Sequence, residues 1–252
     1  MTLLMDSWYQ TLRDLRTRFR MPVFIFMSLF QPIVWLLLFP QVFKSLSEIV
    51  GSNYLQVITP GVVVMTVLFG SAWSGMSMLQ DIDMGILSKM LATPVNRASI
   101  IMGRVVGAMV ILVIQALIIF ILAVILGVDL ATGAPGVLLS IGLISLLGLG
   151  FAAFSNGMAL LFRRAEPMMA VINFVALPTV FLSSAFMLPG LLPDWLDTVR
   201  QFNPVDYAVV GVRSLTNEGF IWSDLWRSFL VLVAWALAGI TFGALMFRSK
   251  AE

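Results

Sequence analysis

Six long runs of apolar residues, separated by short polar segments, dominate the chain. A helix that crosses about 30 Å of hydrocarbon needs roughly 20 such residues, because it rises about 1.5 Å per residue. The runs lack the alternation of apolar and polar positions that marks barrel strands, so they predict helices. The predicted spans are Pro22–Phe43, Val57–Leu79, Ile100–Val128, Val137–Phe162, Pro167–Leu188 and Leu225–Phe247. We therefore expect an all-α membrane protein with a single transmembrane domain, residues 1–252.

Residues 1–20, before the first run, predict an amphipathic helix that lies in the membrane interface. Apolar side chains recur every three or four residues along one face, and arginines occupy the opposite face. The apolar positions are Leu4, Trp8, Leu12, Leu15 and Phe19, and the basic ones are Arg13, Arg16 and Arg20. We expect the arginines to reach anionic headgroups. A simple basic flank would explain the arginines but not the apolar stripe.

Small and polar residues within the spans are few and grouped. The fourth span contains Gly142, Gly148, Gly150 and Gly157, which predict close packing against another helix. Three amide side chains lie at depth, and each needs a hydrogen-bond partner inside the bundle, so they either line a pathway or join helices. These residues are Gln115, Asn156 and Asn173.

The distribution of basic residues predicts the orientation, because cytoplasmic loops retain positive charge. One face of the predicted topology carries 11 of the 15 basic residues, and both termini lie on that face. We therefore expect cytoplasmic termini and a location in the plasma (inner) membrane of a bacterium. The first run is too long for a signal-peptide core, so it is predicted to be a retained span.

Composition narrows the chemistry. Hydrophobic residues make up 60% of the chain and charged residues 11%, with a mean hydropathy of +1.01, which excludes an ordinary soluble domain. The chain has no cysteine and no histidine, so it lacks the commonest metal ligand and general base. Arg104 is the only charged residue well inside a span, and it can snorkel to the nearby end. We expect neither catalytic residues nor a metal site, and a transporter of this kind would take its energy from a partner.

The loop between spans two and three, residues 80–97, carries an apolar stripe with helical spacing. The stripe consists of Leu79, Ile82, Ile86, Leu87 and Met90. It stops at Thr93 and Pro94, where a threonine N-cap followed by proline is a start signal for the next helix. The sequence therefore predicts a short helix, a sharp corner and then the third span.

The segment between spans five and six, residues 189–224, is too polar and too interrupted by proline and glycine to span a membrane. Its apolar and aromatic positions, including Trp195, Leu196, Tyr207 and Trp222, are typical of residues that anchor at an interface. We expect short helices that are half-sunk in the outer interface.

The inner loop resembles the corresponding loop of ABC-2 permeases, in particular those near the daunorubicin-resistance exporters. An acidic pair, a glycine, spaced leucines and a Thr-Pro-x-x-Arg corner carry the resemblance, at Asp81, Asp83, Gly85, Leu87, Leu91, Thr93, Pro94 and Arg97. In that family the loop supplies the coupling helix that docks into an ATPase subunit. The resemblance thus assigns ATPase coupling to these eight residues together with Met90 and with Lys89, which stands where an acidic residue is more usual.

The outer segment extends the resemblance, through a Leu-Pro-x-Trp-Leu stretch and an Asn-Pro-x-x-Tyr corner followed by an arginine. The family then implies re-entrant helices that form an outer gate, with Pro193, Trp195, Asn203, Pro204, Tyr207 and Arg213. Spans one and five line the substrate path in this family. The corresponding candidates here are Phe24, Phe26, Gln31, Phe174 and Ser183.

No Gly-x-x-x-x-Gly-Lys-Ser/Thr loop is present, so ATP and Mg²⁺ are expected in a separate ATPase subunit and no cofactor in this chain. Six spans are half the usual complement of such exporters, which implies a second permease chain, identical or closely related, with a homodimer as the expected form. No nucleic-acid partner is expected. The leading hypothesis is the permease subunit of an ATP-driven exporter of a drug-like molecule or lipid. A polysaccharide or glycolipid exporter and a channel or scaffold subunit that works without ATP are the alternatives.

Overall fold

The computed structural model describes residues 3–20, 22–42, 54–92, 97–186 and 193–250. Within these ranges the side chains of residues 3, 4, 18, 22–25, 91, 97, 98, 101 and 248–250 lie outside the description. All regular elements of the described residues are helical, as predicted. They are α1 (Leu3–Phe19), α2 (Pro22–Val42), α4 (Tyr54–Ala72), α5 (Ser74–Asp83), α6 (Ile86–Leu91), α7 (Arg97–Ile125), α8 (Gly133–Phe162), α9 (Ala165–Phe181), α10 (Asp194–Arg200), α11 (Pro204–Arg213), η2 (Ser214–Glu218) and α12 (Trp222–Lys250).

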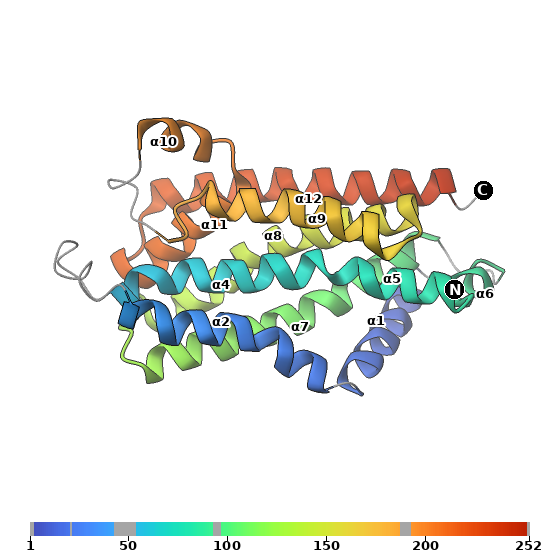
Figure 1. Cartoon of the computed structure of the whole chain (residues 1–252), viewed down its shortest axis with the longest axis horizontal. Coiled ribbons are helices and arrows are strands. Elements are labelled where there is room, and N and C mark those ends of the chain that lie inside the picture. The colour runs from blue at the N-terminus through green and yellow to red at the C-terminus, as the bar shows by residue number, and fades with distance from the viewer. Residues whose placement is uncertain (1–2, 21, 43–53, 93–96, 187–192, 251–252) are drawn as a thin grey trace.

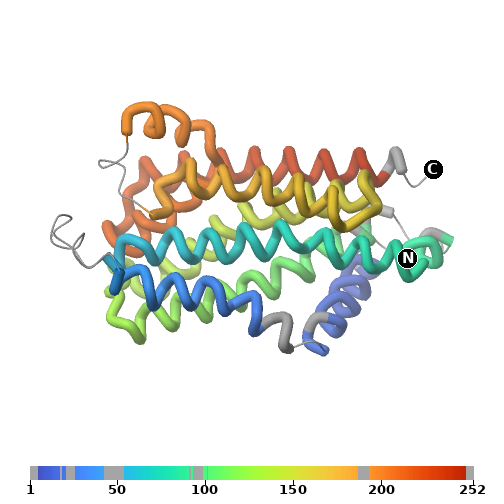
Figure 2. Tube along the Cα trace, viewed as in Figure 1, coloured from blue at the N-terminus to red at the C-terminus, as the bar shows by residue number. Residues whose placement is uncertain are grey.

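The long helices run roughly along the longest axis of the molecule (Figure 1). Helix α6, the start of α1 and the end of α12 lie at one end, which we call the α6 end. Helix α10 lies at the opposite end, the α10 end. The trace in Figure 2 follows the same path and shows α1 inclined to the other helices. Both described ends of the chain therefore share one end of the bundle.

Within the described residues, four helical stretches are long and apolar enough to cross a membrane: Tyr54–Asp83, Met102–Ile125, Gly133–Phe162 and Trp222–Phe247. They correspond to the second, third, fourth and sixth predicted spans. The apolar stretches Phe26–Val42 and Ala165–Phe181, in place of spans one and five, are shorter. Helix α9 has 17 residues, which gives a length of about 26 Å.

Span five ends earlier than predicted, at Phe181 rather than near Leu188. The last turn tightens there, because the Ser183 N–H donates to the carbonyl of Val180 at 3.2 Å instead of to that of Thr179. The amide of Asn203 takes over the freed Thr179 carbonyl at 2.5 Å. A distant residue thus ends the helix, and the apolar pattern alone gives no sign of it.

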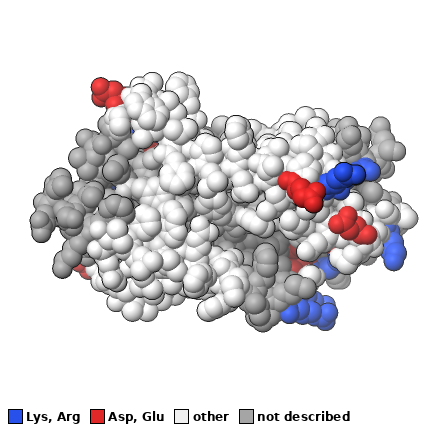
Figure 3. All heavy atoms as spheres, in the orientation of Figure 1, with Lys and Arg blue, Asp and Glu red and all other residues white. Residues whose placement is uncertain are grey.

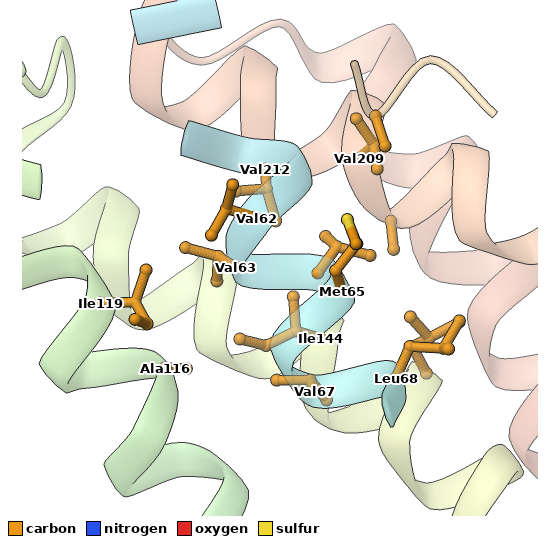
Figure 4. Packing of buried hydrophobic residues seen from close by; sticks show 14 of the residues in the cluster. Val62, Val63, Met65, Val67, Leu68, Ala116, Ile119, Ile144, Val209 and Val212 are labelled. Atoms are coloured by element: carbon orange, nitrogen blue, oxygen red, sulfur yellow. The ribbon is translucent and has the colours of Figure 1, made fainter. Parts of the chain in front are cut away.

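Helix α4 lies in the middle of the bundle and contacts α2, α7, α8, α9 and α11. Figure 4 shows Val62, Val63 and Val67 of α4 packed near Ile119 of α7 and Ile144 of α8. Of the apolar window that includes α4, 83% is buried, compared with 22% for that of α12. A helix that is apolar all round and enclosed by protein is a core helix, whereas α12 exposes apolar side chains to the surroundings.

Glycines bring α8 and α12 into close contact. A Cβ atom on Gly239 of α12 would overlap the backbone of Gly150, and one on Gly157 would crowd Phe242 and Gly243. The small-residue surface predicted on the fourth span is therefore a packing surface. Gly142 is an exception, because a Cβ atom there would meet nothing within 4 Å. The matching glycines on α12, Gly239 and Gly243, were not predicted as part of this packing surface.

A break at Trp73 separates α4 from α5, and side chains of α8 bind the backbone groups on either side of it. The hydroxyl of Ser155 accepts from the Gly75 N–H at 3.0 Å and donates to the carbonyl of Ala72. The amide of Asn156 donates to the hydroxyl of Ser74 at 3.1 Å. Of the two roles left open for Asn156, the structure selects the joining of helices.

Candidate coupling end and outer segment

Helix α6 begins after a sharp turn at Met84 and Gly85. Gly85 has φ +66°, in the left-handed region that suits glycine, and its N–H donates to the Ile82 carbonyl at 3.0 Å. Helix α5 therefore ends at Asp83, and the chain turns directly into a second short helix. A short helix in this loop is confirmed, but the predicted stripe is divided: Leu79 and Ile82 belong to α5, and only Ile86, Leu87 and Met90 belong to α6. The corner at Thr93 and Pro94 lies outside the described residues.

Helix α6 has a buried face and an exposed face. Leu87 is buried, and Met90 packs against the same small core together with Ile82. Ser88 and Lys89 are exposed, as are Asp83 and Met84 just before the helix. In the surface view, Lys and Arg side chains gather at this end and the middle of the visible face is almost free of charge (Figure 3). The structure thus offers a polar, projecting surface at the α6 end.

An ion cluster centred on Asp81 joins the helices beneath α6. One carboxylate oxygen of Asp81 accepts from Arg13 of α1 at 2.7 Å and also from Arg104 of α7. Arg13 also contacts the sulfur of Met90 at 3.4 Å. Asp81 is 7% exposed and Arg104 is 6% exposed, so this pair is buried, whereas the Arg13 side chain is 38% exposed. Four helices, α1, α5, α6 and α7, are linked at this point.

The cluster corrects two predictions. Arg13 was expected to reach lipid headgroups with the other arginines of the first helix, and Arg104 was expected to snorkel. Both instead bind Asp81, because a buried carboxylate without a cation would be far costlier than a paired one. Arg16 and Arg20 remain exposed, as their predicted role requires.

Helix α1 packs its small polar residues against α7. The Thr11 hydroxyl donates to the carbonyl of Gly103 at 3.1 Å, and Gly103 and Gly107 leave room for the close approach. Trp8 and Phe19 of the predicted apolar stripe are 60% and 54% exposed. Leu12 and Leu15 of the stripe are half-buried. The amphipathic pattern therefore predicts the exposed apolar residues but not the polar face that docks on protein.

The outer segment forms α10, α11 and η2, and Asn203 positions α11. Its side-chain oxygen accepts from the Val205 N–H at 3.0 Å, which makes it the N-cap of α11, with Pro204 at the first helical position. Its amide nitrogen donates to the carbonyls of Thr179 and Leu182 at the end of α9. One side chain therefore begins α11 and ends α9.

Asp206 and Arg213 hold the turn that follows α9. Asp206 accepts from the Ser184 N–H at 2.7 Å and from Arg200 at 2.9 Å, and Arg213 donates to the Ser184 carbonyl at 2.5 Å. Arg213 is 3% exposed. Burial lowers the pKa of its guanidinium to about 10, although the Asp206 carboxylate opposes that effect. These contacts fix α11 against the end of α9.

The two helices of the outer segment differ in burial. Trp195 of α10 is 62% exposed, and Pro193 is exposed as well, which fits an interfacial location. Helix α11 is more deeply buried than predicted, because Val205, Val209 and Val212 pack into the core around α4. The Tyr207 hydroxyl donates to the Gln201 carbonyl at 3.0 Å.

The π-helix η2 was missed by sequence reasoning. It ends at Gly219, whose φ of +106° and N–H bond to the Ser214 carbonyl at 2.7 Å complete the wide turn. The carbonyl of Thr216 accepts from Ala131, and Asn217 donates to the carbonyl of Gln56 at 2.9 Å. In the sequence, only Gly219 could have indicated that a turn ends at this point. Through η2 the outer segment is joined to α4 and to the connection between α7 and α8.

The candidate substrate-path residues do not converge. Gln31 lines a cavity, Phe26 and Phe174 are 65% and 80% exposed, and Ser183 is buried in the turn after α9. The Phe24 side chain lies outside the described residues. The side chains of the coupling candidates Leu91 and Arg97 also lie outside the description, as do the whole residues Thr93 and Pro94. Among the substrate-path candidates whose side chains the structure describes, only Gln31 lines a cavity.

Long apolar helices, a short projecting helix at one end and a buried bent segment at the other define a polytopic helical membrane protein. Among the described residues no three acidic side chains converge as metal ligands. The ABC-2 type transporter profile matches residues 7–216. The chain belongs to the ABC-2 type transporter family, as the resemblance of its loops indicated.

Named relatives agree with this membership. The chain is 29% identical to ycf38 of Cyanophora paradoxa, named as a transport permease, over 87% of this chain and 81% of that protein. It is 24% identical to the daunorubicin resistance ABC transporter permease DrrB1 of Streptomyces coeruleorubidus, over 90% of this chain and 79% of that permease. It is 22% identical to DrrC of Mycobacterium tuberculosis, named for doxorubicin resistance, over 77% of this chain and 70% of DrrC. The chain is thus similar to membrane transport permeases along most of its length.

Proposed function

We propose that this chain is the permease subunit of an ATP-driven exporter and that a separate ATPase subunit docks on helix α6. The observation that carries the proposal is the α6 end itself. A short helix projects there with Ser88 and Lys89 exposed, while Leu87 and the Asp81 cluster anchor it to the bundle. A force applied to α6 would therefore be transmitted directly to α1, α5 and α7.

The remaining parts of the proposal follow from family membership and sequence. The exporter contains two copies of this chain, each with six spans and with the α6 end in the cytoplasm of a cell bounded by the plasma (inner) membrane. ATP and Mg²⁺ bind to the ATPase subunits. Asp206, Asn203 and Arg213 keep the outer segment closed in the resting state. We propose a hydrophobic or amphipathic substrate, because two similar permeases are named for resistance to such drugs.

A charge-reversal experiment tests the docking of the ATPase on α6. The test variant combines Met84→Asp with Lys89→Glu, two exposed positions next to and within α6. Purified permease is used to capture an ABC-type ATPase subunit that is co-expressed with it. We expect the capture affinity to fall about tenfold or more, because like charges and lost apolar contact at the centre of an interface are costly.

The matched control combines Arg164→Glu, at the N-cap of α9, with Ala165→Asp, at the first position of that helix. These residues are also exposed, and the changes in charge are the same. This variant should capture the ATPase as the unchanged permease does. Equal loss in both variants would argue against docking on α6. Transport by the permease reconstituted without any ATPase would reject the ATP-driven mechanism.

A further inference from the structure

A cavity of about 430 Å³ lies among α1, α2, α4, α5 and α7, and we call it the α1–α2 cavity. Helix α2 lines it from Met27 to Trp35, about 12 Å along the helix axis. Met27 and Trp73 line the cavity and are 62% and 40% exposed, so the cavity reaches the surface of the molecule. It extends from Gln80, near α6, toward Val62 in the middle of the bundle.

One part of the cavity wall is apolar and aromatic. Trp35 of α2 and Met65 and Phe69 of α4 line it, and Trp35 stacks on Phe39 with ring centroids 4.7 Å apart. A stacked ring has restricted motion, so this wall is a preformed surface for an apolar or aromatic body. Such walls make up most of the lining of small-molecule sites in proteins.

Amide and hydroxyl groups interrupt this apolar lining. Gln31, Ser77 and Gln80 contribute side chains to the wall, and the Gln115 amide donates to the Ser28 hydroxyl at 2.6 Å, which joins α7 to α2. In a span, such groups are costly unless they have polar partners. The cavity therefore offers hydrogen bonds along its length, nearer to α6 in particular, where Ser77 and Gln80 lie.

From these features we infer that the α1–α2 cavity binds one drug-sized amphipathic molecule, with its apolar body against Trp35 and Phe69 and its polar end toward Gln80. The volume of about 430 Å³ lies in the range of about 300–1,000 Å³ that is typical of small-molecule sites. The site lies within a single copy of the chain; α2 of span one lines it, including Gln31, and none of the described residues of α9 does. Its role as a substrate site rests on the proposed function, whereas binding itself does not.

Ligand protection of a single introduced thiol tests the site. The chain has no cysteine, so Ser77→Cys places one thiol in the cavity with little change in side-chain size. The matched control is Ser145→Cys, a half-buried serine of α8 that is not among the lining residues. Purified permease without ATPase is labelled with a small maleimide, with and without the cationic amphipathic dye rhodamine 6G.

We expect rhodamine 6G to slow labelling of the Ser77→Cys variant and leave the Ser145→Cys variant unchanged. At a dye concentration about ten times Kd, the labelling rate should fall about tenfold. As a second variant, Ser77→Trp fills the cavity and should weaken binding of the dye about tenfold, whereas Thr241→Trp, at an exposed position of α12, should not.

Several results would overturn the inference. They are equal slowing at both thiols, slowing at neither, and a Ser77→Cys thiol that does not react even without dye. The α6 charge-reversal test is independent of these measurements. Protection without ATPase capture would keep the site and reject the exporter mechanism, and capture without protection would do the reverse.

Discussion

Asp81 and Asp83 are separated by a single residue and have different surroundings. Positions two apart on an α-helix differ by about 200° around the axis, so their side chains point to nearly opposite sides. Asp81 is 7% exposed and binds two arginines, whereas Asp83 is exposed. Of this acidic pair, the first holds the helices together and the second faces away from the bundle.

The substitution Asp81→Asn should therefore destabilise the protein strongly. It removes the anion that compensates the buried Arg104 and the partly exposed Arg13, and the loss of one partner from a buried pair costs about 3–5 kcal/mol. The thermal unfolding of detergent-purified permease measures the change. The control, Asp83→Asn, should alter stability by less than about 0.5 kcal/mol. Similar unfolding temperatures for the two variants would contradict the assigned role of Asp81.

At the scale of elements, the pairing of α8 with α12 depends on the absence of side chains. Helix association in a membrane gains little from the hydrophobic effect, so it relies on close packing. Gly239 and Gly243 of α12 lie four residues apart and approach Gly150, Ala153 and Gly157 of α8. Four residues correspond to about one helical turn, so both glycines share one face.

The substitution Gly239→Leu should separate α12 from α8. A Cβ atom there would overlap the backbone of Gly150, which cannot move aside as a flexible side chain can. We expect a loss of about 3 kcal/mol or more, measured as a lower midpoint of thermal aggregation in detergent. The matched change Gly142→Leu adds the same side chain to α8 in open space and should be tolerated. A tolerated Gly239→Leu variant would show that the two helices are not packed in this way.

At the scale of the whole molecule, the number of crossings decides which parts of the chain lie on the same side of the membrane. Helices α7, α8 and α9 separate α6 from α10, and α2 and α4 separate α1 from α6. If α9 and α2 both cross, α1 and α6 share one side and α10 lies on the other. The arrangement of the two ends in Figure 1 fits this topology.

Single cysteines at Arg16, Lys89 and Thr198 test the crossings in this cysteine-free chain. All three residues are exposed. A membrane-impermeant maleimide should label the Arg16→Cys and Lys89→Cys variants only in inside-out vesicles, and the Thr198→Cys variant only in right-side-out ones. Labelling of Lys89→Cys and Thr198→Cys from the same side would mean that α9 does not cross. Labelling of Arg16→Cys and Lys89→Cys from opposite sides would mean that α2 does not.

The sequence by itself determined the helical class, the approximate position of the long helices and the presence of a short helix in the loop before Thr93. These features depend on local patterns, namely a continuous apolar run and a helical stripe, whereas the turn at Gly85 came from the structure. The motifs of the two loops also led to the correct family.

Only the tertiary structure decided the partners. Arg13 and Asp81 lie 68 residues apart, and Asn203 reaches back 24 residues to the end of α9. No local pattern specifies such contacts, because polar residues can be satisfied by lipid headgroups, water or protein. The α1–α2 cavity is built by five helices, so it too follows from packing alone. Periodicity fixes what each helix buries, whereas packing fixes which groups meet.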